Sequence, residues 1–237
     1  YWYEEQEPLG GLFGDGDGRG YTRHDAITDE ALHVFRNTYP DAFGARHGKP
    51  ARAKKHGGSE LTKEDIFYYI YGILHSPEYR TRFEANLKKE LPRIPLADDF
   101  ARFSKAGRAL ADLHLRYETV EPWDGIIEEG DSANPGRTEK MRFGKCKKDD
   151  AHPKGEDVTV LCVSENMVLR NIPERAYDYV ANGKSAIGWL MDRSQVRTDK
   201  ASGIVNDPND YSDDPRYIVD LVKRVVRVSM ETLEIVG

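Results

Sequence analysis

Val158-Thr159-Val160-Leu161-Cys162-Val163, followed after Ser164-Glu165-Asn166 by Met167-Val168-Leu169, is the stretch that decides the fold class. Both apolar runs are rich in β-branched and aliphatic residues, which favour strands, and the polar tripeptide between them is typical of a turn. The stretch therefore predicts a β-hairpin. Since the segments on both sides of it have helical periodicity, we expect a chain that mixes helices with a small antiparallel sheet.

A set of helices is predicted on the N-terminal side of this hairpin. Thr62-Lys63-Glu64-Asp65 has the spacing of a capping box, and apolar residues at helical spacing follow it through residues 66–74. Ser76-Pro77 ends this helix and opens a second one, which continues to about Leu87. A third amphipathic helix is predicted over residues 98–117.

The segment between the helices and the hairpin is rich in Gly, Pro and acidic residues, which predicts loops. Met141-Arg142-Phe143 is a short strand candidate within it. Glu128-Glu129 and Asp149-Asp150 are expected to be solvated carboxylate pairs in these loops.

After the hairpin, Pro173 is predicted to start a short helix, and Ser185 to cap another that ends near Arg193. Residues 198–214 are predicted to be a loop. Asp213-Asp214-Pro215 opens a last, largely buried helix that is rich in Val and Leu.

The predicted fold class is α+β, with a helical subdomain and a small, mostly antiparallel sheet framed by the C-terminal helices. Residues 1–60 are expected to form an N-terminal hairpin or loops, a short helix capped by Thr28, and a basic loop. Residues 61–120 form the helical subdomain. Residues 121–237 form a mixed part that ends in the C-terminal helix.

Composition narrows the class of protein. A net charge of −6 argues against a general polycation, so any binding of nucleic acid requires a local basic face. No window approaches the roughly 18 apolar residues of a membrane span, and the N-terminus does not have the pattern of a signal peptide. Two cysteines, Cys146 and Cys162, are typical of thiols in a cytoplasmic protein. The missing initiator Met indicates a fragment or a processed product.

The sequence contains no complete catalytic or metal-binding motif. Gly183-Lys184-Ser185 resembles the end of a phosphate-binding loop, but position 178, where that loop needs Gly, is Asp178. The histidines lack metal-ligand spacing, and neither Asn134-Pro135-Gly136 nor Asp207-Pro208-Asn209 matches an adenine-methyltransferase signature. We therefore predict no catalytic residue, no metal ligand and no cofactor for this fragment.

Candidate recognition residues remain, and they fall into two groups. The first could neutralise DNA phosphates: Arg23, Lys49, Arg52, Lys54 and Lys55. The second mixes cations with amides that can hydrogen-bond base edges: Asn182, Lys184, Arg193, Gln195, Arg197, Lys200 and Asn206. For the first group a solvated charged loop is the alternative, and for each member of the second a structural turn or cap, as Asn182-Gly183 illustrates.

Several segments carry a resemblance to a known family: Leu61 to Tyr69, Leu91-Pro92-Arg93-Ile94-Pro95, Asn182 to Ile187, Gln195 to Lys200, and Gly203 to Asn209. With them, nearly the whole chain resembles the C-terminal specificity (target-recognition) domain of Type ISP restriction-modification enzymes, which are often labelled putative helicases. The resemblance implies a domain that reads a double-stranded DNA target and presents it to an adenine-N6 methyltransferase. The parent it implies is a single chain with nuclease, ATP-dependent translocase and methyltransferase parts, which uses ATP, Mg and S-adenosylmethionine in bacterial defence.

A second function remains open. The chain could be a non-catalytic interaction module that docks the methyltransferase and motor domains, and its acidic balance favours that role.

Overall fold

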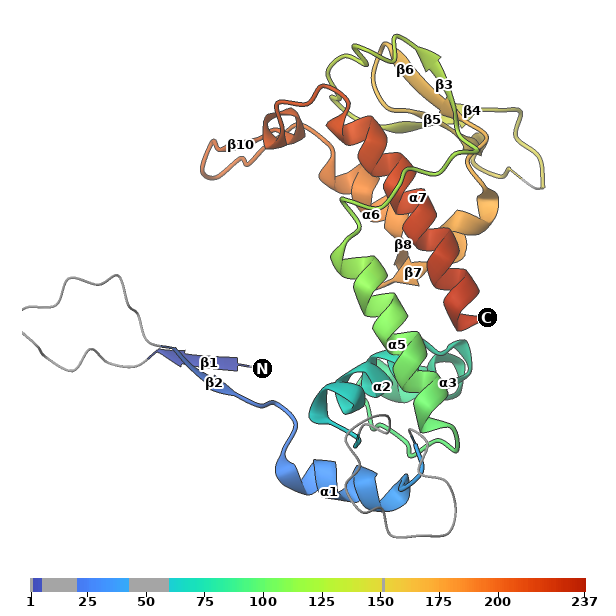
Figure 1. Ribbon diagram of the computed structural model, residues 1–237. Coiled ribbons are helices and arrows are strands. Elements are labelled where there is room, and N and C mark those ends of the chain that lie inside the picture. The colour runs from blue at the N-terminus through green and yellow to red at the C-terminus, as the bar shows by residue number, and fades with distance from the viewer. Residues whose placement is uncertain (1, 6–20, 43–59, 151) are drawn as a thin grey trace, which may run out of the picture. The chain divides into compact units, whose positions relative to one another are not determined.

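The computed structural model describes residues 2–5, 21–42, 60–150 and 152–237, with the backbone alone for residues 2–5 and 21–24 (Figure 1). Two compact units divide the chain, Tyr1–Ala109 and Leu110–Gly237. The boundary lies within helix α5 (Phe100–Leu115).

The first unit holds helices and one small hairpin. Its elements are β1 (Trp2–Glu5) and β2 (Tyr21–His24), which pair antiparallel, then α1 (Asp29–Thr38), α2 (Lys63–His75), α3 (Pro77–Arg82), α4 (Glu84–Leu87) and the first part of α5. The helix starts follow the sequence signals. Thr28 Oγ1 accepts from the backbone N–H of Ala31 at 3.2 Å, and the predicted capping box of Thr62 and Asp65 is confirmed.

The prediction that a single second helix follows Ser76-Pro77 is wrong, because this segment is divided into α3 and α4. Phe83 lies between them with φ −111° and ψ 16°, outside the helical range. Its ring packs against the ring of Tyr79 at 5.0 Å between centroids, which turns Phe83 toward the core.

The core of the first unit is aromatic. Tyr69 and Phe100 are buried and stacked, with centroids 4.8 Å apart, and the Phe35 ring meets both edge-on. The Tyr69 hydroxyl donates to the carbonyl of Pro95 at 2.6 Å and accepts from the N–H of Ala97 at 2.8 Å. The buried hydroxyl therefore fixes the segment that leads into α5.

The second unit is built on a four-stranded antiparallel sheet. Its strands are β3 (Ile127–Gly130), β4 (Arg142–Lys145), β5 (Glu156–Cys162) and β6 (Met167–Arg170), in the order β3-β6-β5-β4. The hairpin predicted from Val158 to Leu169 is confirmed as β5 and β6, and the predicted strand around Phe143 is confirmed as β4.

Short elements connect the sheet to the last helix. They are η1 (Glu174–Asp178), β7 (Val180–Ala181), β8 (Lys184–Ser185), α6 (Ala186–Arg193), β9 (Arg197–Thr198), β10 (Val205–Asn206), η2 (Pro208–Tyr211) and α7 (Tyr217–Val236). Ser185 caps α6 as predicted, with its Oγ accepting from the N–H of Gly188 at 3.1 Å. Figure 1 shows α6 and α7 beneath the sheet, and buried residues of the sheet such as Leu161 and Met167 form one core with Val222 and Val226 of α7.

Two predictions in this unit are wrong. Glu128-Glu129 does not lie in a loop, because residues 127–130 form strand β3 by pairing with β6, a segment distant in sequence. Residues 198–214 are not all loop, since they include most of the β9–β10 hairpin and η2. The two-residue strands of that hairpin are too short to give a period in the sequence.

Small antiparallel sheets and helices together confirm the α+β class. That residues 1–60, 61–120 and 121–237 act as one recognition domain stays a prediction. None of the helices in the described residues has the length and apolar character needed to cross a membrane.

Candidate nucleic-acid interface

A small ribbon in the second unit brings several predicted recognition residues together. The backbone N–H of Val196 donates to the carbonyl of Glu139 at 3.1 Å, and Gln195 pairs antiparallel with Lys140. On the other side, Arg197 and Thr198 pair with Asn206 and Val205. Residues 139–140, 195–198 and 205–206 therefore lie side by side as three hydrogen-bonded segments, which we call the ribbon.

One face of the ribbon carries four polar side chains. Residues directly opposite each other on paired strands share a face, and residues two apart on one strand do too. Gln195 is opposite Lys140, and Arg197 is opposite Asn206. Lys140, Gln195, Arg197 and Asn206 therefore lie on one side, called the polar face below. Arg197 Nη2 donates to Gln195 Oε1 at 3.3 Å, as this arrangement requires.

The cations of this region are not neutralised by ion pairs. In the described part of the chain, no carboxylate lies within 4.0 Å of the charged groups of Lys140, Arg197 or Lys200. Lys200 is exposed in the turn between β9 and β10. These three cations are thus available to an external anion such as a DNA phosphate.

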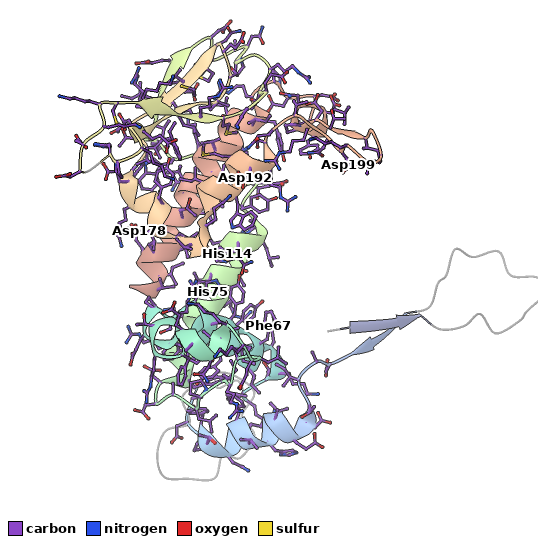
Figure 2. The ribbon with its side chains drawn as sticks, turned by 180° about the vertical axis from the view of Figure 1, so that it is seen from behind. Phe67, His75, His114, Asp178, Asp192 and Asp199 are labelled. Carbon is purple, nitrogen blue, oxygen red and sulfur yellow. The ribbon has the colours of Figure 1, made fainter. Side chains whose placement is uncertain are left out.

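The β9–β10 turn is closed by Asp199. Its Oδ1 accepts from the N–H groups of Ala201 and Ser202 at 3.0 and 2.7 Å and from the Ser202 hydroxyl at 2.8 Å. These hydrogen bonds hold the pKa of Asp199 below its usual range, so the carboxylate stays charged. Figure 2 shows Asp199 on the hairpin that projects from this unit, apart from Asp192 on α6.

Asn209 anchors the base of the hairpin. Its side-chain amide forms two hydrogen bonds with the backbone of Thr138, accepting from the N–H at 2.9 Å and donating to the carbonyl at 3.0 Å. An amide that pairs with both groups of one residue acts as an added strand residue. Asp207 caps η2 by accepting from the N–H of Asn209 at 2.9 Å, and it forms an ion pair with Arg137.

Sequence reasoning missed Lys140, Arg137 and Asn209. Asp207-Pro208-Asn209 did contain a usable signal, since Asp followed by Pro is typical of the start of a helical turn. Nothing local marks Lys140 or Arg137, because their role depends on pairing with a segment distant in sequence.

Two predicted amides have internal partners. Gln195 Nε2 donates to the carbonyl of Met191 at 3.1 Å, and Asn206 Oδ1 accepts from the Tyr211 hydroxyl at 2.9 Å. Each amide group has further donor or acceptor capacity, so these contacts orient the two side chains and still allow an external hydrogen bond.

Asn182 and Lys184 do not belong to the polar face. Asn182 has φ 51° and Gly183 has φ 78°, the left-handed pair that a two-residue turn between β7 and β8 requires. Lys184 forms an ion pair with Asp192 and lies 5.4 Å from the centre of the Trp189 ring. These contacts give both residues a structural role, and their binding to DNA stays a prediction.

Arg193 occupies the last turn of α6, just before the ribbon, and is exposed. The five predicted phosphate-binding residues fall outside the described side chains: Arg23, Lys49, Arg52, Lys54 and Lys55. Over the described residues, no group of three or more His, Cys, Asp or Glu side chains is placed to hold a metal ion.

A comparison with protein families matches residues 1–221 to the Type ISP C-terminal specificity domain. Among solved structures, a nuclease-deletion mutant of the Type ISP restriction-modification enzyme LlaGI, in complex with a DNA substrate mimic, is 46% identical over 75% of this chain, with a TM-score of 0.65. The ATP-dependent Type ISP restriction-modification enzyme LlaBIII, bound to DNA, is 35% identical over 99% of this chain, with a TM-score of 0.74.

A DrdV–DNA complex is 28% identical over 89% of this chain, with a TM-score of 0.66. The chain spans only 14%, 13% and 19% of the LlaGI, LlaBIII and DrdV chains, respectively. A comparison with curated proteins gave no significant match.

Proposed function

The chain belongs to the family of Type ISP C-terminal specificity domains, and from that premise we propose that it recognises a specific sequence in double-stranded DNA through the polar face of the ribbon. The LlaGI and LlaBIII structures are of Type ISP restriction-modification enzymes, with a DNA substrate mimic and with DNA respectively, and the DrdV structure is a complex with DNA. Target recognition by this chain would present the site to the methyltransferase of a longer parent.

The observation that carries the proposal is the grouping of Gln195, Arg197 and Asn206 on one face beside Lys140. The major groove of B-DNA admits a β-ribbon, and its base edges differ in their donor and acceptor pattern. Arg pairs in a bidentate manner with guanine, and Asn and Gln do so with adenine. Lys140 and Lys200 would contact phosphates and fix the register without reading sequence.

The catalytic activities belong, in this proposal, to other parts of the parent. ATP and Mg would serve its translocase, and S-adenosylmethionine its adenine-N6 methyltransferase, while this chain contributes recognition alone. An enzyme of this kind acts on DNA in the bacterial cytoplasm, where the free thiols of Cys146 and Cys162 are stable.

A test is selection from a randomised duplex library by the chain at two salt concentrations, followed by sequencing of the retained DNA. We expect one asymmetric motif and an affinity that falls steeply as salt rises. Retention without a motif would contradict autonomous sequence reading and reduce the chain to a phosphate-binding element.

The interaction module is the second candidate, because the chain is acidic overall, with a net charge of −6. Reversal of charge at Arg197 with Arg197→Glu separates the two functions. If the polar face binds DNA, the added carboxylate repels phosphate and affinity falls. Unchanged affinity for DNA, together with unchanged thermal stability, would favour the interaction module.

A further inference from the structure

A cavity of about 510 Å³ lies in the second unit, next to the ribbon. It is bounded by α6, α7, η2 and the end of α5, and its volume is in the range of small-molecule sites. Six of its lining residues carry aromatic rings: His114, Tyr117, Tyr179, Trp189, Tyr211 and Tyr217. Aliphatic side chains of α7, such as Leu221 and Val225, complete the lining.

Hydrogen bonds and ring stacking hold several of these rings in place. Trp189 Nε1 donates to the carbonyl of Ala181 at 2.7 Å, which fixes the indole. His114 and Tyr179 are stacked, with centroids 5.6 Å apart and planes 20° apart, and His114 Nε2 hydrogen-bonds to the Thr232 hydroxyl at 2.8 Å. Planar walls that are already ordered lose little entropy when a flat ring stacks on them.

Two charged groups at the cavity are open to a ligand. Glu118 Oε1 accepts from the hydroxyls of Tyr117 at 2.6 Å and Tyr217 at 3.5 Å, while its Oε2 has no hydrogen-bond partner in the described part of the chain. Among the described residues, Arg193 has neither an ion pair within 4.0 Å nor a hydrogen bond, although its charge acts on the neighbouring Asp192. An apolar cavity therefore carries one free acceptor and one free cation.

We propose that this cavity binds a nucleobase with an exocyclic amino group, with the ring stacked among the aromatic side chains, the amino group donating to Glu118 and the attached phosphate paired with Arg193. Aromatic side chains provide stacking surfaces for bases, because every base has a flat π-face. An apolar side chain of a partner protein would fill the same volume, but it would leave Glu118 and Arg193 without partners. Charge complementarity therefore favours a nucleotide.

The base could come from a free nucleotide or from a DNA strand. Arg193 and Ser194 line the cavity, and Gln195 follows them directly on the ribbon. A base displaced from a duplex on the polar face would thus be close to the cavity. Only this second source rests on the proposed function, because binding of a free nucleotide requires no duplex.

In the first arm of the test, the chain is titrated with adenosine, cytidine and uridine monophosphates and with ribose 5-phosphate, and binding is followed by calorimetry and by quenching of tryptophan fluorescence, to which Trp189 contributes. We expect the adenosine and cytidine nucleotides to bind more tightly than uridine monophosphate, and ribose 5-phosphate to cause no quenching. Glu118→Gln should remove the preference for amino-bearing bases, and Arg193→Gln should weaken binding of every nucleotide. Lys89→Gln, an exposed change in the first unit, is the matched control.

The second arm compares a duplex with one unpaired adenine, the same duplex with an abasic residue there, and the fully paired duplex. A preference of about tenfold for the adenine over the abasic residue, lost in Glu118→Gln, would assign the cavity to a DNA base. Binding of free nucleotides without that preference would support the nucleobase site with a free nucleotide as its ligand.

If the chain bound no nucleotide and showed no preference for the unpaired adenine, the proposal would be overturned. Equal binding of the adenosine and uridine nucleotides would overturn the role of Glu118. Selection of a motif from paired duplexes is measured separately, so the nucleobase site and the reading of duplex DNA can fail independently.

Discussion

Glu128 on β3 and Arg216 at the start of α7 form a bidentate ion pair, with nitrogen–oxygen distances of 2.9 and 3.1 Å. Lys223, on the next turns of α7, donates to Glu128 Oε1 at 2.8 Å, and Asp220 accepts from Arg216 at 2.8 Å. The Glu128 side chain is only 14% exposed. The network thus joins the edge strand of the sheet to the helix that covers it, and a planar guanidinium suits this two-point contact.

The network makes stability depend on pH. The hydrogen bond from Arg216, followed by that from Lys223 against the cost of burial, lowers the pKa of Glu128 from 4.5 to about 2. A folded pKa below the unfolded value means that the contribution is fully present above about pH 4.5 and is lost as the pH falls toward 2. A shift of this size corresponds to a contribution of Glu128 to the free energy of unfolding on the order of 3 kcal/mol.

We therefore expect Glu128→Gln to lower the free energy of unfolding at pH 7 by about 2–3 kcal/mol, because two cations lose their shared carboxylate. Between pH 5 and pH 2, the free energy of unfolding of the variant should also decline much less than that of the unsubstituted chain. Urea unfolding at a series of pH values measures both effects. Glu165→Gln, an exposed change in the β5–β6 turn, is the control, and equal pH profiles for the two variants would contradict the role of the network.

Local signals in the sequence predicted elements well where caps and periodicity act within a few residues. The capping box at Thr62, the β5–β6 hairpin and the Ser185 cap are all of this kind. Local signals did not predict β3, since Glu128 becomes part of a strand only through its pairing with Leu169. For the same reason, the sequence predicted only some of the residues of the polar face. Gln195 and Arg197 are neighbours in sequence, whereas Lys140 joins them only through a long-range bridge.

Close packing of α2 and α5 in the first unit was equally invisible in the sequence. A Cβ atom at Gly107 would lie 1.8 Å from the carbonyl oxygen of Tyr68 and 2.7 Å from the backbone N of Gly72. Both obstacles are backbone atoms of α2, so no side-chain rotation can relieve the overlap. The two glycines therefore allow the helix axes to approach more closely than alanine would permit.

Gly107→Ala should accordingly destabilise the first unit by roughly 2–3 kcal/mol, although alanine is the better helix former. Thermal unfolding of Gly107→Ala measures the effect. Ala109→Ser, an exposed change on the same helix, is the control variant. A gain in stability for Gly107→Ala would show that the two helices are not in backbone contact.

Asn209 gives a prediction about the geometry of the hairpin. Asn209→Ala removes both hydrogen bonds to Thr138 and leaves a buried backbone N–H and carbonyl without their partners, at a cost of roughly 1–3 kcal/mol. Hydrogen exchange at the Thr138 amide should accelerate, and selectivity for the DNA target should fall because the polar face loses its fixed position. Asn134→Ala, on an exposed loop, is the control. Unchanged exchange at Thr138 would show that the Asn209 side chain does not hold this segment.

The last prediction separates reading of bases from binding of phosphates. Arg197 lies on the polar face, whereas Lys200 lies in the turn beyond it. Arg197→Gln should cost about 1–3 kcal/mol on the preferred target and relax selectivity at one position of the motif. Lys200→Gln should weaken binding to all duplexes to a similar extent and reduce the slope of log affinity against log salt by about 1.

Equilibrium binding at several salt concentrations, on the selected target and on duplexes with each position changed, measures both effects. Lys89→Gln is the control, because it removes one exposed cation that belongs to neither the polar face nor the β9–β10 turn, and it should alter neither quantity. If Arg197→Gln weakened binding to all duplexes equally and lowered the salt slope as Lys200→Gln does, Arg197 would be a phosphate contact. Sequence reading would then rest on Gln195 and Asn206, whose amides are already oriented by Met191 and Tyr211.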